Sequence, residues 1–258
     1  MSTAIQYLQR NIRSEILKSR RSATSWLTII GALFVPIVYC IVYLSYPEKM
    51  VPGPGANPWE RLLAEEWMFV SFLLLPFYII LVGTLLGQTE HKANAWKQLL
   101  AEPVPRYSIY FGKLGIVLLT VAICYILFVG SSIVVGYFVG WVHPQLGFWK
   151  YTPPVGDVAV LVTRLYLVAL PIMALHTWLG IRFKNFVLPA GIGLVMIIAS
   201  LIMIRGWEYQ YVFPYTYPTL TLNAKSTGSL YKHEYWAIGY FLLFSLLGYV
   251  DFLRKKDA

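Results

Sequence analysis

The chain has 258 residues, of which 58% are hydrophobic and 13% are charged, and its mean hydropathy is +0.61. These values exclude an ordinary soluble domain, so apolar runs are compared with the roughly 20 residues that a helix needs to cross a bilayer. The formal net charge is +9. Because the basic residues lie at the ends of apolar runs, they indicate membrane topology and anionic head groups rather than nucleic-acid binding.

The first expected element is an amphipathic helix over residues 1–25 that lies along the membrane surface. Apolar residues recur there at helical spacing and basic residues occupy the other side: Ile5, Leu8, Ile12 and Ile16, against Arg10, Arg13, Lys18, Arg20 and Arg21. The alternative is a solvated basic segment that only fixes the topology.

Six apolar runs, each about as long as a membrane span, follow in chain order. They cover residues 26–46, 67–87, 114–140, 157–181, 186–204 and 236–253. Five tryptophans at their ends fit an interfacial anchoring role: Trp26, Trp67, Trp141, Trp207 and Trp236. The sequence therefore predicts an all-α integral membrane protein with one transmembrane domain over residues 1–258.

The distribution of Lys and Arg predicts the orientation. Six spans place both termini on one side, together with segment 88–113 and the turn after the fourth span. That side carries fourteen basic residues and the other side carries six. By the positive-inside rule, both termini and segment 88–113 are cytoplasmic, and residues 205–235 form an external loop.

Sequence motifs for catalysis and metal binding are absent. The chain has no GxxxxGK[ST], HExxH or GxSxG pattern, and its four histidines are scattered. We therefore expect no catalytic residue, no metal site and no cofactor bound by this chain. If its work needs ATP, another chain supplies it.

Arg164 is the basic residue that lies within a predicted span. A charge at such a position is costly and usually faces a partner or water. The alternatives are a side chain that snorkels outward or forms a structural ion pair, and a contact with an anionic substrate group.

Segment 88–113 is the longest polar interruption on the predicted cytoplasmic side. A short helix is expected there, with Trp96, Leu99 and Leu100 on one face and Pro103 and Pro105 ending it. Such a helix has no core of its own and needs something to pack against. The residues alone leave open whether that is the head-group layer or a groove on a soluble protein.

The same segment resembles the cytoplasmic loop of type-2 ABC transporter permeases, most closely those of lantibiotic immunity and bacitracin resistance. Those permeases carry a Glu, a Trp-Lys-x-Leu-Leu, a Pro-x-x-Arg and a Lys-Leu directly after the second of six spans. The matching residues are Glu90, Trp96, Lys97, Leu99, Leu100, Pro103, Arg106, Lys113 and Leu114. The pattern Glu15-x-x-Lys18 before the first span is also similar to the family.

The resemblance implies a permease subunit of an exporter, which pairs with a second permease chain as a homo- or heterodimer. It implies that residues 88–113 hold a coupling helix that meets an ABC ATPase subunit, which carries the ATP and Mg²⁺. It also implies re-entrant helices before the last span, with Pro214, Tyr215, Tyr217 and Pro218 as an external gate. The expected location is the bacterial cytoplasmic membrane.

The cargo implied by this resemblance is an amphipathic peptide, such as an antibiotic or lantibiotic, or a lipid-linked compound. Two other functions stay open. One is a membrane sensor or assembly subunit that does not transport, and the other is a membrane-embedded enzyme acting on lipids.

Overall fold

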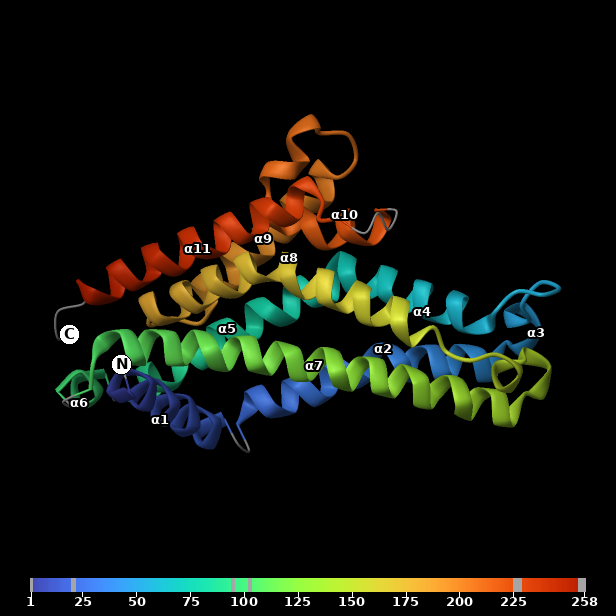
Figure 1. Cartoon of the computed structure of the whole chain (residues 1–258), viewed down its shortest axis with the longest axis horizontal. Helices are drawn as coiled ribbons and strands as arrows, with labels where there is room; N and C mark the ends of the chain where they lie inside the picture. The colour runs from blue at the N-terminus through green and yellow to red at the C-terminus, as the bar shows by residue number, and fades with distance from the viewer. Residues whose placement is uncertain (1, 20–21, 94–95, 102–103, 225–228, 255–258) are drawn as a thin grey trace.

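The computed structural model describes residues 2–19, 22–93, 96–101, 104–224 and 229–254, which form helices joined by short turns (Figure 1). The longer helices are α1 Ser2–Ser19, α2 Ala23–Ser45, α4 Pro58–Phe69, α5 Leu75–Lys92, α7 Arg106–Val142, α8 Val155–Arg182, α9 Val187–Met203 and α11 Lys232–Leu253. The short ones are α3 Pro47–Met50, the π-helical turn η1 Val70–Leu74, α6 Trp96–Ala101, η2 Pro144–Leu146, η3 Phe148–Lys150, η4 Glu208–Val212, η5 Pro214–Thr216 and α10 Tyr217–Asn223. The predicted all-α class is confirmed for these residues.

Five helices in the described part of the chain are long and apolar enough to cross a membrane. They are α2, the continuous run from α4 through η1 to α5, α7, α8 and α11, and they match five of the six predicted spans. Helix α9 lies where the fifth span was predicted, at 186–204, but it has only 17 residues. The six-span count and the re-entrant course of residues 205–235 therefore stay predictions.

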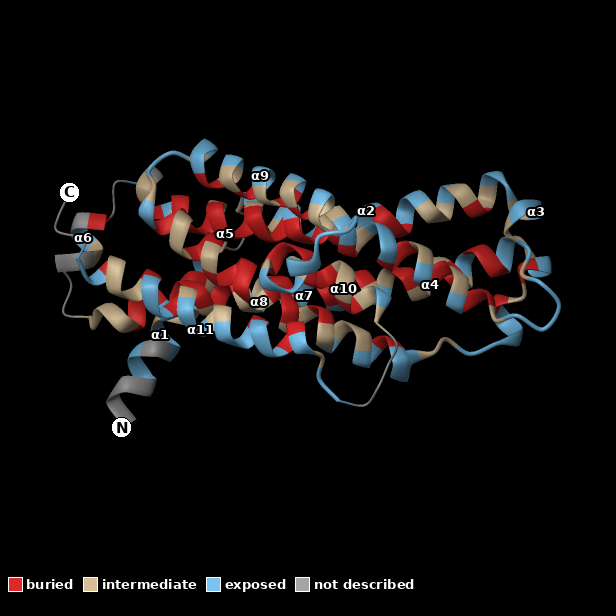
Figure 2. Cartoon of the chain, turned by 90° about the horizontal axis from the view of Figure 1, so that it is seen from above, coloured by how far each residue is buried: buried red, intermediate tan, exposed pale blue. Residues whose placement is uncertain are grey.

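The long helices are staggered along the longest axis of the molecule (Figure 1). Helices α1 and α6 and the C-terminal end of α11 lie at one end, which we call the platform end, and α3 lies at the other. Helix α7 runs along almost the whole length, whereas α11 reaches only from the platform end to the middle. Buried residues follow the centre of the bundle along α5, α7 and α8, and the outward faces of α9 and α11 are exposed (Figure 2).

Helix α4 continues into α5 through the π-helical turn η1, where the N–H of Leu75 bonds to the carbonyl of Val70, five residues earlier. The sequence predicted a span beginning at residue 67. Instead, the helix begins at Pro58, directly after Asn57, whose side chain accepts a hydrogen bond from the Trp59 N–H at 3.0 Å. Asparagine before a proline at the first helical position is a strong helix start, which explains the earlier boundary.

Trp67 corrects a further expectation. It was predicted to anchor the chain at the membrane interface, but its indole is buried and packs against Tyr125 and Phe128 of α7. Because α4 continues into α5, Trp67 falls within the helix rather than at its end, on the face that meets α7.

Helices α5 and α8 cross at glycines, which lets their backbones approach closely. A Cβ atom on Gly83 would lie 2.9 Å from the Cβ of His176, and one on Gly87 would overlap the backbone of Gly180. This crossing is the packed centre of the bundle, because the side chains around it include buried Ile79, Ile80, Val82, Ile172 and Met173.

Gly87→Ala is expected to lower the free energy of unfolding by about 1–3 kcal/mol, because the added methyl group forces α5 away from α8. Gly130→Ala is the matched control, since Gly130 also lies within a helix but an added Cβ meets nothing within 4 Å. Thermal unfolding of the two purified variants compares them. Equal stability of both variants would contradict the close crossing.

Candidate functional site

Four charged side chains from three helices meet at the platform end. Lys113 of α7 lies 2.5 Å from Glu90 of α5 and 3.2 Å from Glu15 of α1. Lys18 of α1 closes the group, at 2.9 Å from Glu15 and 3.2 Å from Glu90. We call these four residues the charge cluster. It joins α1, which lies outside the spans, to the ends of two long helices.

The charge cluster is largely out of contact with water. Lys113 is 1% exposed and Glu90 is 3% exposed, whereas Lys18 lies at the rim with part of its side chain in solvent. Burial lowers the pKa of Lys18, but the hydrogen bonds and charges of Glu15 and Glu90 outweigh this and hold it above its ordinary value. Buried ion pairs of this kind add little net stability compared with apolar packing, but they are strongly disrupted when one partner is removed. The cluster thus fixes the relative position of the three helices.

Helix α1 packs closely on α7 at a glycine of α7, Gly112. A Cβ atom on Gly112 would lie 3.2 Å from the Cβ of Asn11, and the Asn11 side chain donates a hydrogen bond of 2.5 Å to the Ser108 hydroxyl. The spacing of Asn11, Glu15 and Lys18 places all three on one face of the helix. The face of α1 that carries Glu15 therefore packs on α7.

Helix α6 is anchored by Trp96, which is only 7% exposed. Its ring lies 5.8 Å from the ring of Phe252 in α11 and 5.4 Å from that of His91, and the Lys113 ammonium lies 5.8 Å from it. The Trp96 side chain thus fills a pocket of its own chain rather than a groove on a partner. The short helix packs against its own molecule, and its contact with an ATPase subunit stays a prediction.

Two other predicted coupling residues, Leu99 and Arg106, are described at this end of the molecule. Leu99 packs against the same apolar cluster as Trp96, and Gln98 between them is exposed. The side chains of Lys97 and Leu100, and Pro103 altogether, lie outside the described residues. Arg106 begins α7 and donates a hydrogen bond of 2.7 Å to the carbonyl of Leu253, so it ties the start of α7 to the end of α11.

Sequence reasoning missed a second set of contacts at the platform end. Asp251 of α11 forms an ion pair with Arg182 and accepts a hydrogen bond of 3.0 Å from the Trp178 indole, both on α8. Gln88 donates to the carbonyl of Phe183 at 2.7 Å, which fixes the turn after α8 to α5. Asp251 could have been singled out as an acidic residue within the last apolar run.

Arg164 lies beside an acidic partner. Its guanidinium is 3.4 Å from both carboxylate oxygens of Glu234 and donates to the carbonyl of Ser229 at 2.9 Å. Glu234 is fully buried and also accepts a hydrogen bond of 2.7 Å from the Tyr231 N–H, at the start of α11. This geometry is that of the structural ion pair, one of the alternatives left open by the sequence.

The four residues named as an external gate are buried together: Pro214, Tyr215, Tyr217 and Pro218. The Tyr215 hydroxyl lies 2.6 Å from Nε2 of His176 in α8, and the Tyr217 hydroxyl donates to the carbonyl of Tyr211 at 2.9 Å. Burial raises the pKa of both tyrosines, so they remain neutral. Residues 214–218 are thus packed into the bundle, and their gating role stays a prediction.

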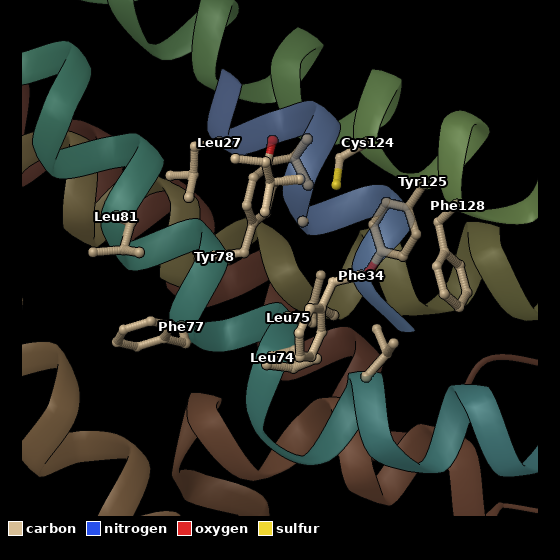
Figure 3. Close-up of a pocket in the computed structure, with 14 residues that line it drawn as sticks. Leu27, Phe34, Leu74, Leu75, Phe77, Tyr78, Leu81, Cys124, Tyr125 and Phe128 are labelled. Atoms are coloured by element: carbon tan, nitrogen blue, oxygen red, sulfur yellow. The ribbon is translucent and has the colours of Figure 1, made fainter. Parts of the chain in front are cut away.

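An apolar cavity of about 170 Å³ opens between α2, the run from η1 to α5, and α7. Figure 3 shows Phe34, Leu75, Tyr78 and Phe128 around it, from three different helices. The Tyr78 hydroxyl is directed away to Thr28, at 2.8 Å, so the wall offers little polarity. Such a cavity suits a hydrocarbon group rather than a charge. Among the described residues there is no group of three or more His, Cys, Asp or Glu that could hold a metal ion.

Lys113→Met is expected to lower the free energy of unfolding by about 3–5 kcal/mol, because it leaves Glu15 and Glu90 buried with only Lys18 to balance them. Adding Glu90→Gln should recover part of this loss. Thermal unfolding of the purified chain measures both. The control Lys184→Met changes an exposed lysine at the same end and should stay within about 0.5 kcal/mol. A Lys113→Met protein as stable as this control would contradict the charge cluster.

Arg164→Met is expected to cost about 1–3 kcal/mol of stability, because Glu234 then keeps a buried charge without its cation. The double variant Arg164→Met with Glu234→Gln should regain part of that stability. Unfolding midpoints of the single and double variants measure the coupling. Unchanged stability of the single variant, together with loss of transport, would instead indicate a substrate contact.

The comparisons with known proteins agree with this architecture. The family described as "ABC-2 family transporter protein" matches residues 11–200, which is more than half of the chain. The search of curated proteins finds no match. The matched region contains the charge cluster, α6 and the helices α2 to α8. The chain therefore belongs to the ABC-2 transporter family and is a multi-pass membrane permease component of an ABC transporter, whose ATPase activity lies on a separate subunit.

Proposed function

We propose that the chain is the membrane subunit of an exporter and that its platform end is cytoplasmic and binds the ATP-hydrolysing subunit. The single observation that supports this proposal is how α6 is fixed to the rest of the molecule. It is a six-residue helix between α5 and α7, fixed through Trp96 to α11 and through Lys113 to the charge cluster. A force applied to α6 therefore reaches several long helices at once.

The contact surface for the partner consists of the exposed side chains around this anchor rather than of Trp96 itself. Gln98 on α6 and Leu17 on α1 are exposed at the platform end. Trp96 acts by holding α6 in place, and the charge cluster holds α1 beside it. In this arrangement α1 and α6 both belong to the surface that contacts the partner. Closure of the ATPase subunits would displace the two helices at the same time.

Displacement would pass from the platform end along α5 and α8. The glycine crossing at Gly87 and Gly180 leaves no gap to absorb a shift, since packed interiors transmit strain rather than deform freely. At the far side of α8, the Arg164–Glu234 pair connects to α11, and Tyr215 connects residues 214–218 to His176. Movement of α8 would thus reach the residues proposed as the external gate.

The proposed cargo is an amphipathic peptide or a lipid-linked compound that leaves the membrane outward. The apolar cavity between α2, α5 and α7 supports a cargo with a hydrocarbon portion (Figure 3). We further propose that two permease chains pair in the bacterial cytoplasmic membrane with both termini inside. The exposed apolar face of α9, which includes Val187, Val195 and Ile202, is available for that pairing.

Photo-crosslinking tests the docking surface. A benzophenone-bearing amino acid at Gln98 or Leu17 is expected to crosslink the chain to a soluble ATPase in the native host. The same probe at Trp149, which is exposed near the opposite end, should not do so. Crosslinks to the ATPase from Trp149 alone would reverse the proposed orientation.

Trp96→Ala should weaken co-purification of that ATPase about tenfold, equivalent to about 1.4 kcal/mol, because α6 loses its anchor. Trp149→Ala is the matched control and should leave the amount unchanged. Normal association of the Trp96→Ala protein would show that α6 does not carry the contact. A chain that binds the ATPase but moves no cargo in reconstituted vesicles would favour the sensor or assembly function.

A further inference from the structure

Glu66 is a buried carboxyl group for which the coupling mechanism has no use. It lies on α4, one turn before η1, and is 0% exposed. Neither of its oxygens makes a hydrogen bond of ordinary geometry with any described residue. A carboxylate removed from water without a cation is strongly unfavourable, so this side chain needs a proton or another positive partner.

The neighbouring Glu65, on the same helix turn, differs from Glu66 in having a cation as partner. The Glu65 side chain is 32% exposed and lies 2.9 Å from Nε of Arg61, as a helical ion pair four residues apart. That pairing occupies Arg61, whose guanidinium also donates to the carbonyl of Lys49. The nearest basic residue along α4 is therefore committed to Glu65.

The other described groups near Glu66 come from α2 and α7, and none of these described groups is a cation. Tyr39 and Tyr43 of α2 lie within electrostatic range of it, and Ser132 of α7 lies beside its carboxyl group. On another side of α4, Glu60 and Asp157 line a separate cavity with Trp67. The described surroundings of Glu66 thus supply hydroxyl groups and further acids, but no positive charge other than the committed Arg61.

Ser132 is the polar side chain of α7 beside the carboxyl group of Glu66. Its hydroxyl donates to the carbonyl of Phe128, four residues earlier, at 2.9 Å. In this arrangement the lone pairs of the Ser132 oxygen can accept a hydrogen bond from Glu66. An ionised carboxylate can only accept hydrogen bonds, whereas a protonated one carries an O–H that can donate. The pair of side chains is therefore complementary when Glu66 carries a proton.

We propose that Glu66 is a proton-binding site within the membrane domain, occupied in the packed arrangement of α2, α4 and α7. A metal ion fits less well, because the described residues offer no set of three or more ligating side chains. The π-helical turn that follows at Val70–Leu74 is a place where a helix can change its register, and such turns are frequent at functional sites. Rotation of α4 at this turn would expose Glu66 and release the proton.

Infrared spectroscopy of the purified full-length chain tests the site directly. At neutral pH the wild-type protein should show the C=O stretching band of a buried carboxylic acid. Glu66→Gln should remove that band, and Glu65→Gln, the matched control, should leave it. A wild-type spectrum without the band, or a band that survives Glu66→Gln, would overturn the proposal.

Thermal stability gives an independent readout. Glu66→Gln is isosteric with the protonated acid and should unfold at nearly the wild-type temperature at about pH 4, where the unfolded chain also keeps most of its proton. Between about pH 4 and about pH 8 the wild type should lose stability relative to this variant, because the folded state keeps a proton that the unfolded state releases. We expect the gap to reach about 3 °C or more. A gap that does not grow with pH would show that Glu66 is ionised in the folded chain at neutral pH.

Discussion

The placement of Lys113 between Glu15 and Glu90 is the constraint on which the platform end depends. One ammonium group, almost fully buried, balances carboxylates from two other helices, and a second lysine completes the set. An unbalanced buried charge is costly. The three helices can therefore move apart only if water or another partner takes the place of the broken ion pairs. The same ammonium also faces the ring of Trp96, which extends the constraint to α6.

This arrangement explains how a six-residue helix can serve as a mechanical element. A helix of this length is not stable by itself in water, since helix nucleation is costly. It is held here by apolar contacts with α11 and by the contact of the Lys113 ammonium with the Trp96 ring. Its exposed side chains are then presented by a rigid base, which is what a contact that transmits force requires.

Away from the platform end, buried polar groups inside the bundle also need partners, and they differ in whether a partner is present. Arg164 is balanced by Glu234 and tied to the start of α11, so its charge is used for structure. The His176 ring is paired with the Tyr215 hydroxyl, which holds residues 214–218 against α8. Glu66 has no such counterpart among the described residues, and this difference separates it from the structural groups.

Much of this molecule could be predicted from sequence because hydropathy and charge act locally. Apolar runs gave the positions of α2, α7, α8 and α11. Helical spacing showed that Trp96 and Leu99 share a face. It could not show what covers that face, since Phe252 lies more than 150 positions away in the chain.

The sequence by itself determined the all-α class and the approximate positions of five spans, because each depends on the hydropathy of one continuous segment. The candidate site residues came from a family resemblance, and their role stays a prediction. Only the tertiary structure decided that Trp96 is buried, that Arg164 meets Glu234, and that α4 and α5 are one helix with a π turn. It also decided that no described residue provides a free cation beside Glu66. These outcomes depend on which distant segments pack together. The same polar residue can therefore be a structural pair, a contact surface or a proton site, according to its neighbours in space.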